Sequence, residues 1–225
     1  MYKLYGHAVS NYFNMIKLVL LEKGIEFEEV HVSPSQEEDF LRLSPMGKIP
    51  ALETPQGVLT ETVVALEYLE DAHPEHPLYP GAPYEKALVR RLCHMGEIYI
   101  DLLARPIFMK DLLGVAEPEH RLQEIEAELT KGAKALAKLA PPSPWMIGEQ
   151  FTAADIVLYF TLLIMTPPIE KHLQLDLFEL MPGYGDWYQN MASRELVKAV
   201  SADIEPAWEG MQKRISEFLA ATAEP

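Results

Sequence analysis

Two short stretches of this chain combine residue types that can bind an anionic, peptide-like ligand. Residues 46–50 read Met-Gly-Lys-Ile-Pro, so Lys48 lies beside backbone that Pro50 leaves exposed. Further along, Glu61 and Thr62 place an acid and a hydroxyl at the start of a helical pattern. A helix N-terminus and a lysine both favour negative charge. The pattern therefore predicts a site for a ligand that carries peptide groups and carboxylates.

Ser10 lies between the first predicted strand and the first predicted helix. From there its hydroxyl could donate a hydrogen bond to a ligand thiol, which has a pKa of about 8.5 when free. Such a bond and the helix dipole both favour the thiolate. Alternatively, Ser10 only caps the helix, which is a common role of serine. Tyr12 offers a phenol that is also a good donor, so both residues remain candidates.

The elements that must position these side chains alternate between strand and helix over the first eighty residues. The expected order is a strand at 2–5, a helix at 11–23, a strand at 25–32, a short helix at 36–43, a hairpin at 49–54 and 57–60, and a helix from Val63. The hairpin connection is too short for a crossover. This order predicts a parallel unit joined to an antiparallel hairpin, as in thioredoxin-like folds.

A proline-rich linker at 73–81 separates this α/β part from a chain that reads as helical throughout. The expected helices span 84–114 with a kink at Pro106, 117–139, and 152–165 ending at Pro167-Pro168, and two shorter helices follow. Thr152 and Asp155 form a capping box, which we assign to folding. We therefore expect two domains, residues 1–78 and residues 84–225.

The composition limits which classes of binding partner and which cellular compartment we expect for this protein. The net charge of −15, from 34 acidic against 19 basic residues, disfavours nucleic acid and membrane surfaces as direct partners. A single cysteine, Cys93, excludes an internal disulfide and a cysteine-based metal cluster. The histidines form no close ligand pair, so no metal is expected. The chain starts directly with a strand and shows no spanning segment, which predicts a cytoplasmic protein.

The segment from Leu4 to Gly24 resembles the serine-type glutathione transferases of bacteria and plants. The run Leu59-Thr60-Glu61-Thr62 and its spacing from Pro50 resemble the same family. The resemblance implies a thioredoxin-like domain that binds glutathione, followed by an all-α domain that contributes a hydrophobic substrate site. Glutathione is then the co-substrate, and no metal is implied.

The resemblance also assigns roles to individual residues. In the family a serine at the place of Ser10 activates the thiol, so we favour Ser10 over Tyr12, although Tyr12, Asn14 and Met15 depart from the usual pattern. Lys48 faces the glycyl carboxylate, Ile49 pairs its backbone beside a cis Pro50, Thr62 binds the γ-glutamyl carboxylate, and Glu61 pairs the amino group.

The implied reaction is attack of the glutathione thiolate on a small hydrophobic electrophile. An apolar pocket is hypothesised from Tyr99, Leu103, Phe108, Met109 and Met165. The family also implies a homodimer, for which Arg90 and Arg91 could meet Glu67 or Glu70 of a partner. Two alternatives stay open: disulfide reduction or isomerisation with glutathione on the same fold, and a non-catalytic binding protein like the stringent starvation proteins.

Overall fold

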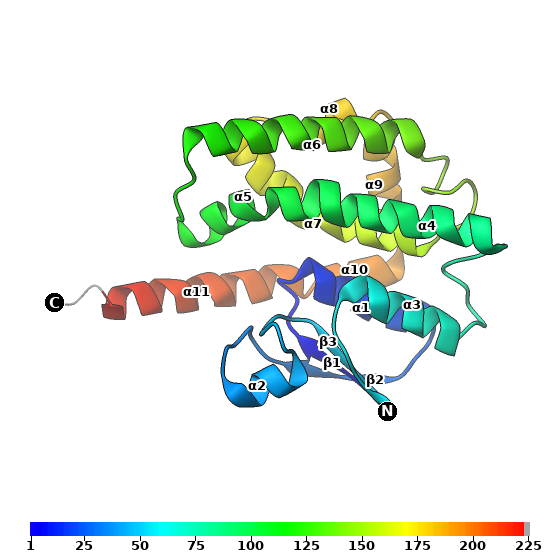
Figure 1. Ribbon diagram of the computed structural model, residues 1–225, viewed down its shortest axis with the longest axis horizontal. Coiled ribbons are helices and arrows are strands. Elements are labelled where there is room, and N and C mark those ends of the chain that lie inside the picture. The colour runs from blue at the N-terminus through cyan, green and yellow to red at the C-terminus, as the bar shows by residue number, and fades with distance from the viewer. Residues whose placement is uncertain (223–225) are drawn as a thin grey trace.

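The computed structural model describes residues 1–222 and divides into a sheet-containing part and a helical part (Figure 1). The first part contains β1 (Tyr2–Gly6), α1 (Asn11–Glu22), β2 (Phe27–His31), α2 (Glu38–Leu43), β3 (Ala51–Thr54), β4 (Gly57–Leu59) and α3 (Thr62–Ala72). Its four strands lie in the order β2-β1-β3-β4. β1 is parallel to β2 and antiparallel to β3, and β3 is antiparallel to β4. The predicted thioredoxin-like fold is confirmed.

Helix α1 lies at the centre of the molecule, between the sheet and the helical part. Its sequence is apolar on more than one face, and the fully buried side chains include Phe13, Ile16, Leu18 and Leu20. The helix contacts α3 in the first part and α7 and α10 in the second. Burial on all sides therefore fixes the N-terminal end of α1, where Ser10 lies.

The second part consists of helices, as predicted. They are α4 (Pro83–Gly96), η1 (Glu97–Asp101), α5 (Leu102–Leu113), α6 (Glu119–Leu139), α7 (Ala153–Leu173), α8 (Leu177–Leu180), α9 (Tyr184–Ser193), α10 (Glu195–Ser201) and α11 (Ile204–Thr222). The capping box is confirmed, because the Thr152 N–H donates to Asp155 Oδ2 at 2.9 Å. The same buried carboxylate accepts from Trp187 Nε1 at 2.9 Å, so it anchors α7 to α9.

The predicted kink lies upstream of Pro106. The first long helix widens into the π-helical turn η1, which ends just before α5 begins at Leu102. A proline ring clashes with the carbonyl four residues before it, which for Pro106 is that of Leu102. A wider turn at this point is a known accommodation inside helices. The distortion therefore involves Asp101, a residue that belongs to the site described below.

The prediction that Pro167-Pro168 end a helix is wrong, because α7 continues to Leu173. Met165, Pro168 and Ile169 are buried against the core, and this packing outweighs the lost backbone hydrogen bonds. Among the described residues, α7 is also the one helix long and apolar enough to cross a membrane by length and composition. Since 78% of that window is buried inside the fold, its apolarity is accounted for by the core.

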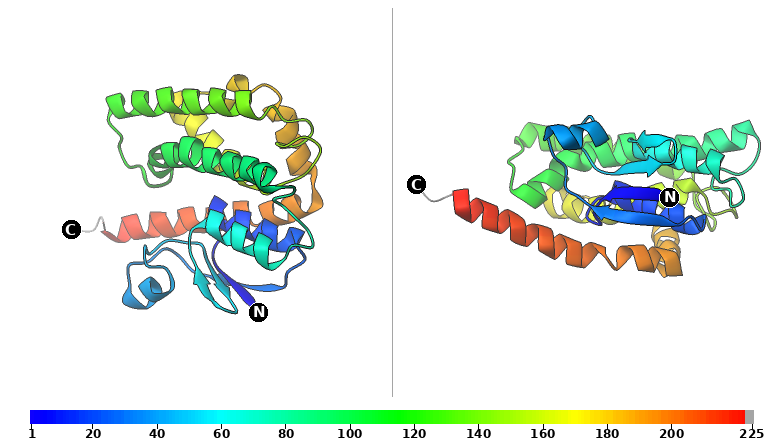
Figure 2. Two further views of the ribbon diagram at one scale, coloured as in Figure 1. Left: turned by 45° about the vertical axis from the view of Figure 1, so that its right-hand side comes forward. Right: turned by 90° about the horizontal axis from the view of Figure 1, so that it is seen from below.

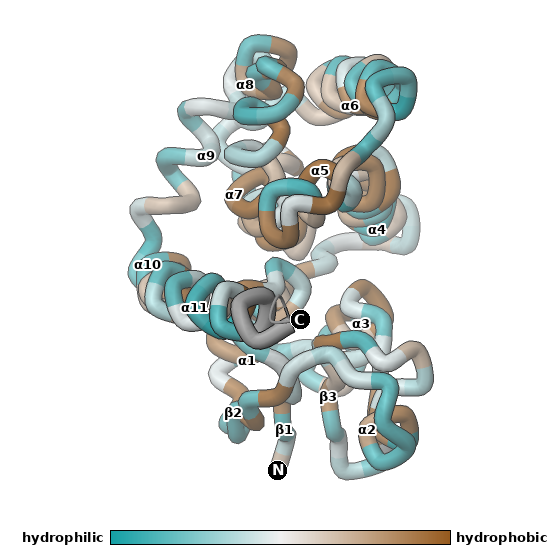
Figure 3. The backbone as a smooth tube through the Cα atoms, turned by 90° about the vertical axis from the view of Figure 1, so that its left-hand side faces the viewer, coloured by the Kyte–Doolittle hydropathy of each residue, from teal (hydrophilic) through white to brown (hydrophobic). Residues whose placement is uncertain are grey.

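The prediction of two shorter helices after the helix at 152–165 is wrong, because the described part of the C-terminal region, up to residue 222, holds four helices after α7. The last of them, α11, runs back past the first part of the chain (Figure 2). Viewed along its axis, α11 lies over α1 and β2, on the side away from α3 (Figure 3). Lys17 of α1 holds its start, because Lys17 Nζ lies 2.9 Å from Asp203 Oδ2.

A buried ion pair fixes the linker between the two parts. Lys23 Nζ lies 2.7 Å from Glu70 Oε2 and also donates to the carbonyls of His73 and His76. Glu70 in turn accepts from the backbone N–H of Leu78 at 2.9 Å. The proline-rich segment is therefore held by charge-assisted hydrogen bonds, which limits how the helical part can move against the sheet.

Candidate active site

Ser10 is the N-cap of α1, and the cap leaves its hydroxyl proton available. Its Oγ accepts from the backbone N–H of Phe13 at 3.3 Å, and its own N–H donates to the carbonyl of His7 at 3.0 Å. A serine hydroxyl has two acceptor lone pairs and one donor. Capping uses an acceptor, so the cap and a donor function are compatible, and the side chain is only half-buried.

The turn from β1 into α1 is held from inside the fold. Asn14 Nδ2 donates to the carbonyl of Ala8 at 2.7 Å, and both residues are buried. Gly6 precedes the turn with φ 147°, a conformation that favours glycine, and an added Cβ there would lie 2.7 Å from the Phe13 ring. The turn therefore presents Ser10 in a fixed place at the helix N-terminus.

The peptide bond between Ile49 and Pro50 is cis, as the resemblance implied. The segment before it is tied down by Ser44 Oγ, which donates to the carbonyl of Lys48 at 2.7 Å. The Lys48 side chain itself is exposed. A cationic group beside the half-buried residue Ile49 suits a ligand with a peptide group and a carboxylate.

Glu61 has φ 65° and ψ 108° at the N-cap of α3, an unusual conformation for a residue with a side chain. Such positions cost free energy and cluster at ligand-binding sites. Thr62 follows as the first residue of α3 and is 6% exposed. The positive end of the α3 dipole therefore lies beside a buried hydroxyl and an exposed carboxylate, a pair able to bind a carboxylate and an ammonium.

The sheet brings the turn that holds Ser10 close to the loop that holds Lys48. Tyr5 of β1 pairs with Ala51 of β3, so the end of β1 lies beside Pro50. A Cβ placed on Gly6 would lie 3.5 Å from the Cβ of Ile49. The turn that holds Ser10 and the loop that holds Lys48 are therefore neighbours.

The helical part adds acidic groups to the same region. Burial raises the pKa of the Glu97 carboxyl. His94 lowers it, whereas the charges of Asp101 and Glu61 raise it further. This interaction places Glu61, at the start of α3, close to the acids of η1. The neighbourhood is suited to a positively charged ligand group, because that charge would offset the mutual repulsion of the carboxylates.

Tyr12 is occupied by a contact between the two parts of the chain. Its hydroxyl donates to Asp101 Oδ1 at 2.8 Å, and the Arg105 guanidinium lies 5.0 Å from the centre of its ring. Burial, followed by the charge of Asp101, raises the pKa of the phenol above its ordinary value. The Tyr12 proton is therefore held by Asp101, whereas Ser10 retains its own.

Asp101, Asn11 and Arg105 are site neighbours that sequence reasoning missed. Asp101 is fully buried and accepts from Asn11 Nδ2, while Arg105 Nε donates to its Oδ1 at 2.7 Å. Arg105 also donates to Asn11 Oδ1 at 2.7 Å. The spacing of Asp101 and Arg105 at i and i+4 was the available signal. This network fastens the first turn of α1, directly after Ser10, to η1 and α5.

The residues proposed to line an apolar pocket do not share one environment. Met165 and Phe108 are buried in the core, and Leu103 packs partly against it. Tyr99 and Met109 are exposed, at 47% and 37%. Phe108 also contacts Trp208 of α11, with ring centroids 5.8 Å apart. The structure therefore assigns Met165 to the core and leaves Tyr99 and Met109 on the surface.

Comparison with known proteins identifies the family. The model of the glutathione S-transferase N-terminal domain matches residues 4–77, and that of the C-terminal domain matches residues 103–195. A glutathione S-transferase of Pseudomonas putida is 35% identical over 215 residues, which cover 96% of this chain and 98% of the relative. The chain belongs to the glutathione S-transferase family, a family of glutathione-using enzymes.

Other relatives show how varied the family is. Maleylacetoacetate isomerase of Mus musculus is 26% identical over 166 residues, covering 69% of this chain and 74% of the relative. The crystal structure of glutathione transferase Omega 3C from Trametes versicolor matches with a TM-score of 0.73 at 27% identity, covering 88% of each chain. Both parts of the fold therefore have counterparts in solved structures.

Proposed function

We propose that this chain is a glutathione transferase in which Ser10 stabilises the glutathione thiolate for attack on a small hydrophobic electrophile. The observation that carries the proposal is that three features lie around the start of β3, which pairs with the end of β1 on one side and, on the other, with β4, which ends two residues before Glu61. They are the capped N-terminus of α1 at Ser10, the cis peptide at Ile49-Pro50, and the positive φ of Glu61 before α3. Together they offer partners for a thiolate, a peptide backbone and a charged amino acid end.

Each end of glutathione has a matching group in this arrangement. The backbone of Ile49 would pair with the cysteinyl peptide groups, and exposed Lys48 would meet the glycyl carboxylate. Thr62 and the dipole of α3 would bind the γ-glutamyl carboxylate, while Glu61 would pair with the amino group. Bound in this direction, the cysteinyl sulfur would face the N-terminus of α1.

The chemical contribution of the protein is to make the thiolate available at neutral pH. A hydrogen bond from the Ser10 hydroxyl and the dipole of α1 both stabilise the anion and lower the thiol pKa. The sulfur then forms a bond to the electrophilic carbon with its electron pair. In a substitution, the leaving group departs with the electrons of the broken bond.

Isomerisation is the second candidate, and the similarity to maleylacetoacetate isomerase favours it. In such a reaction the thiolate adds to an activated double bond, the resulting single bond rotates, and elimination restores both the double bond and glutathione. The same thiolate site serves both reactions. They differ in consumption of glutathione, which falls mole for mole in the transferase reaction and stays constant in isomerisation.

We also propose a homodimer and a cytoplasmic location. We predicted that Glu67 or Glu70 of a partner subunit would pair with Arg90 or Arg91. The structure pairs both acids within the chain instead: Arg90 Nε lies 2.9 Å from Glu67 Oε1, and Glu70 is paired with Lys23. Support for the dimer therefore comes from the family resemblance alone. The location is supported by composition, in which the one cysteine, Cys93, is buried and unpaired.

Calorimetric titration with glutathione separates an enzyme from a non-catalytic binding protein on this fold. Binding in the millimolar range or tighter supports the proposal. No binding, in a protein whose circular dichroism shows it to be folded, would favour the partner-binding alternative. Glutathione consumption with 1-chloro-2,4-dinitrobenzene then tests the transferase reaction itself.

A further inference from the structure

An open pocket with both polar and apolar lining lies between α11 and the first part of the chain, apart from the residues assigned to glutathione. It has a volume of about 410 Å³, and its polar lining comes from His7, His31, Ser33 and Arg214. A second pocket of about 500 Å³ adjoins it, since His7 and His31 line both. A pocket of about 410 Å³ can hold a small organic molecule.

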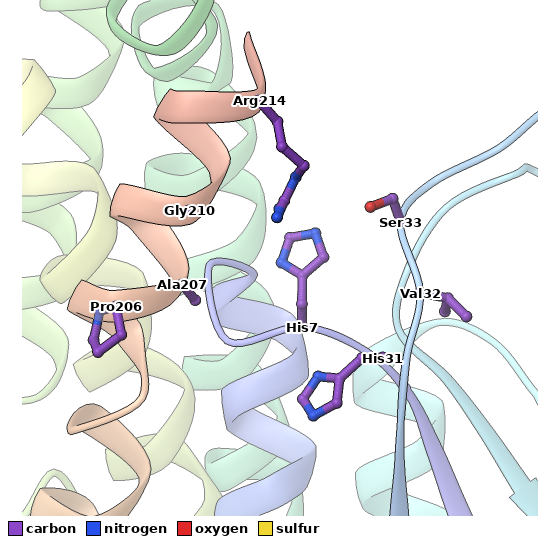
Figure 4. A pocket seen from close by; sticks show the side chains of 8 residues that line it. All are labelled: His7, His31, Val32, Ser33, Pro206, Ala207, Gly210 and Arg214. Carbon is purple, nitrogen blue, oxygen red and sulfur yellow. The ribbon is translucent and has the colours of Figure 1, made fainter. Parts of the chain in front are cut away.

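The side chains at one end of this cavity face one another from separate elements. In Figure 4, Arg214 of α11 extends toward the ring of His7, and the Ser33 hydroxyl faces the same space from the segment after β2. His7 Nδ1 is buried and has no hydrogen-bond partner among the described residues. A buried polar atom without a partner is costly, so a ligand that supplies one is favoured.

The charge at this end belongs to Arg214. Burial lowers the pKa of the His7 imidazole, and the nearby charges of Arg214 and His31 act in the same direction, against a smaller opposing effect of the His7 backbone. His7 is therefore a neutral donor or acceptor near pH 7. Within the described part of the chain, no carboxylate lies within ion-pair distance of Arg214, so its guanidinium is available to an anion.

The opposite end limits the charge that a ligand can carry. Lys17 Nζ lies 2.7 Å from Glu29 Oε1 and 2.9 Å from Asp203 Oδ2, so two carboxylates surround one ammonium. That end has a net negative charge and repels a multiply charged anion. Between the two ends, Pro206 and Ala207 supply apolar surface.

We propose that this cavity binds a small monocarboxylic acid with an apolar body. The carboxylate would take a bidentate hydrogen bond from Arg214 and a further one from the Ser33 hydroxyl or the His7 ring. The apolar body would cover Pro206 and Ala207, away from Glu29 and Asp203. This site is separate from the proposed glutathione site and does not depend on it.

The ligand would also connect α11 to the turn that holds Ser10. The backbone carbonyl of His7 accepts the Ser10 N–H at 3.0 Å, so His7 and Ser10 belong to one turn. A carboxylate that bridges Arg214 and this turn would hold α11 against the first part of the chain. Binding should therefore raise the melting temperature, because the ligand binds only the folded state.

Benzoate is a suitable probe, with benzamide as its uncharged counterpart of the same shape. The protein without glutathione is titrated with each, and the histidine ring signals are followed in ¹H–¹⁵N spectra, with His7→Gln used for assignment. We expect benzoate to shift the His7 and His31 signals with millimolar or tighter affinity, and benzamide to bind at least about tenfold more weakly, or ~1.4 kcal/mol.

Two variants of α11 separate a built site from a general charge effect. Arg214→Gln should weaken benzoate at least about tenfold and leave benzamide unchanged. Lys213→Gln removes the same charge from the neighbouring, exposed residue and should change neither. Equal binding of benzoate and benzamide, equal effects of the two variants, or no shift at all would overturn the proposal. Shifts with inorganic phosphate but not benzoate would point to a different ligand class and overturn it as well.

Discussion

The hydroxyl of Tyr12 donates to Asp101 Oδ1 at 2.8 Å, joining the first turn of α1 to the π-helical turn η1. This contact bears on which hydroxyl serves the thiol. Asp101 is fully buried and also accepts from Arg105 and Asn11. A phenol bound in such a network has its proton engaged, which favours Ser10 as the thiolate donor.

Ser10→Ala should raise the pKa of bound glutathione by at least about one unit, because the thiolate loses a hydrogen bond. The rate with 1-chloro-2,4-dinitrobenzene should fall at pH 7 and recover at higher pH. A pH–rate profile measures this shift. Since Ser10 also caps α1, its removal should cost about 1 kcal/mol of stability, and thermal unfolding checks that the variant is folded.

Tyr12→Phe should leave the pH–rate profile unchanged and lower the free energy of unfolding instead. The buried Asp101 carboxylate would lose one donor, which costs about 1–3 kcal/mol. Urea unfolding measures the loss. If the phenylalanine variant lost the profile and Ser10→Ala kept it, Tyr12 would be the donor and our assignment would be wrong.

Thr62→Ala should weaken glutathione binding by about 1–3 kcal/mol, because a carboxylate would lose a donor in a partly dry site. Thr62 is buried at the first turn of α3, so calorimetry should be paired with circular dichroism. Val64→Ala, at an exposed position of the same helix, is the matched control and should bind as wild type. Unchanged affinity in a folded Thr62 variant would remove this residue from the site.

Lys23→Met should destabilise the fold by about 3–5 kcal/mol, since it leaves the buried Glu70 carboxylate without its cation. The loss also frees the linker carbonyls of His73 and His76. Lys134→Met makes the same chemical change at an exposed position and should cost little. Denaturant unfolding compares the two, and equal midpoints would show that the buried pair contributes nothing to stability.

The His7 imidazole should make stability depend on pH near neutrality. Because burial lowers its pKa below 6.5 in the folded state, the unfolded chain binds this proton more readily. The contribution of His7 to the free energy of unfolding is therefore present above about pH 6.5 and declines as the pH falls below it. His7→Gln should flatten this decline, whereas His120→Gln, at an exposed position, should not.

Light scattering tests the proposed homodimer. At micromolar concentration in moderate salt, the mass should be about twice the 25.5 kDa of one chain. A mass of one chain would refute the dimer.

Local patterns in the sequence determined the fold class, and the resemblance to glutathione transferases supplied the residues of the proposed glutathione site. Strand and helix periodicity, the proline-rich linker and the Thr152–Asp155 capping box depend on near neighbours, and all have counterparts in the structure. The same holds for Ser10, Pro50 and Thr62, whose places at the ends of elements follow from spacing along the chain.

Only the tertiary structure decided the interactions between distant segments. The continuation of α7 through Pro167-Pro168 depends on packing that no local propensity records. The partner of Tyr12 is Asp101, and the cavity at His7 exists because α11 returns to the first part of the chain. Such contacts form between residues far apart in sequence, where burial and charge are set by the folded chain as a whole.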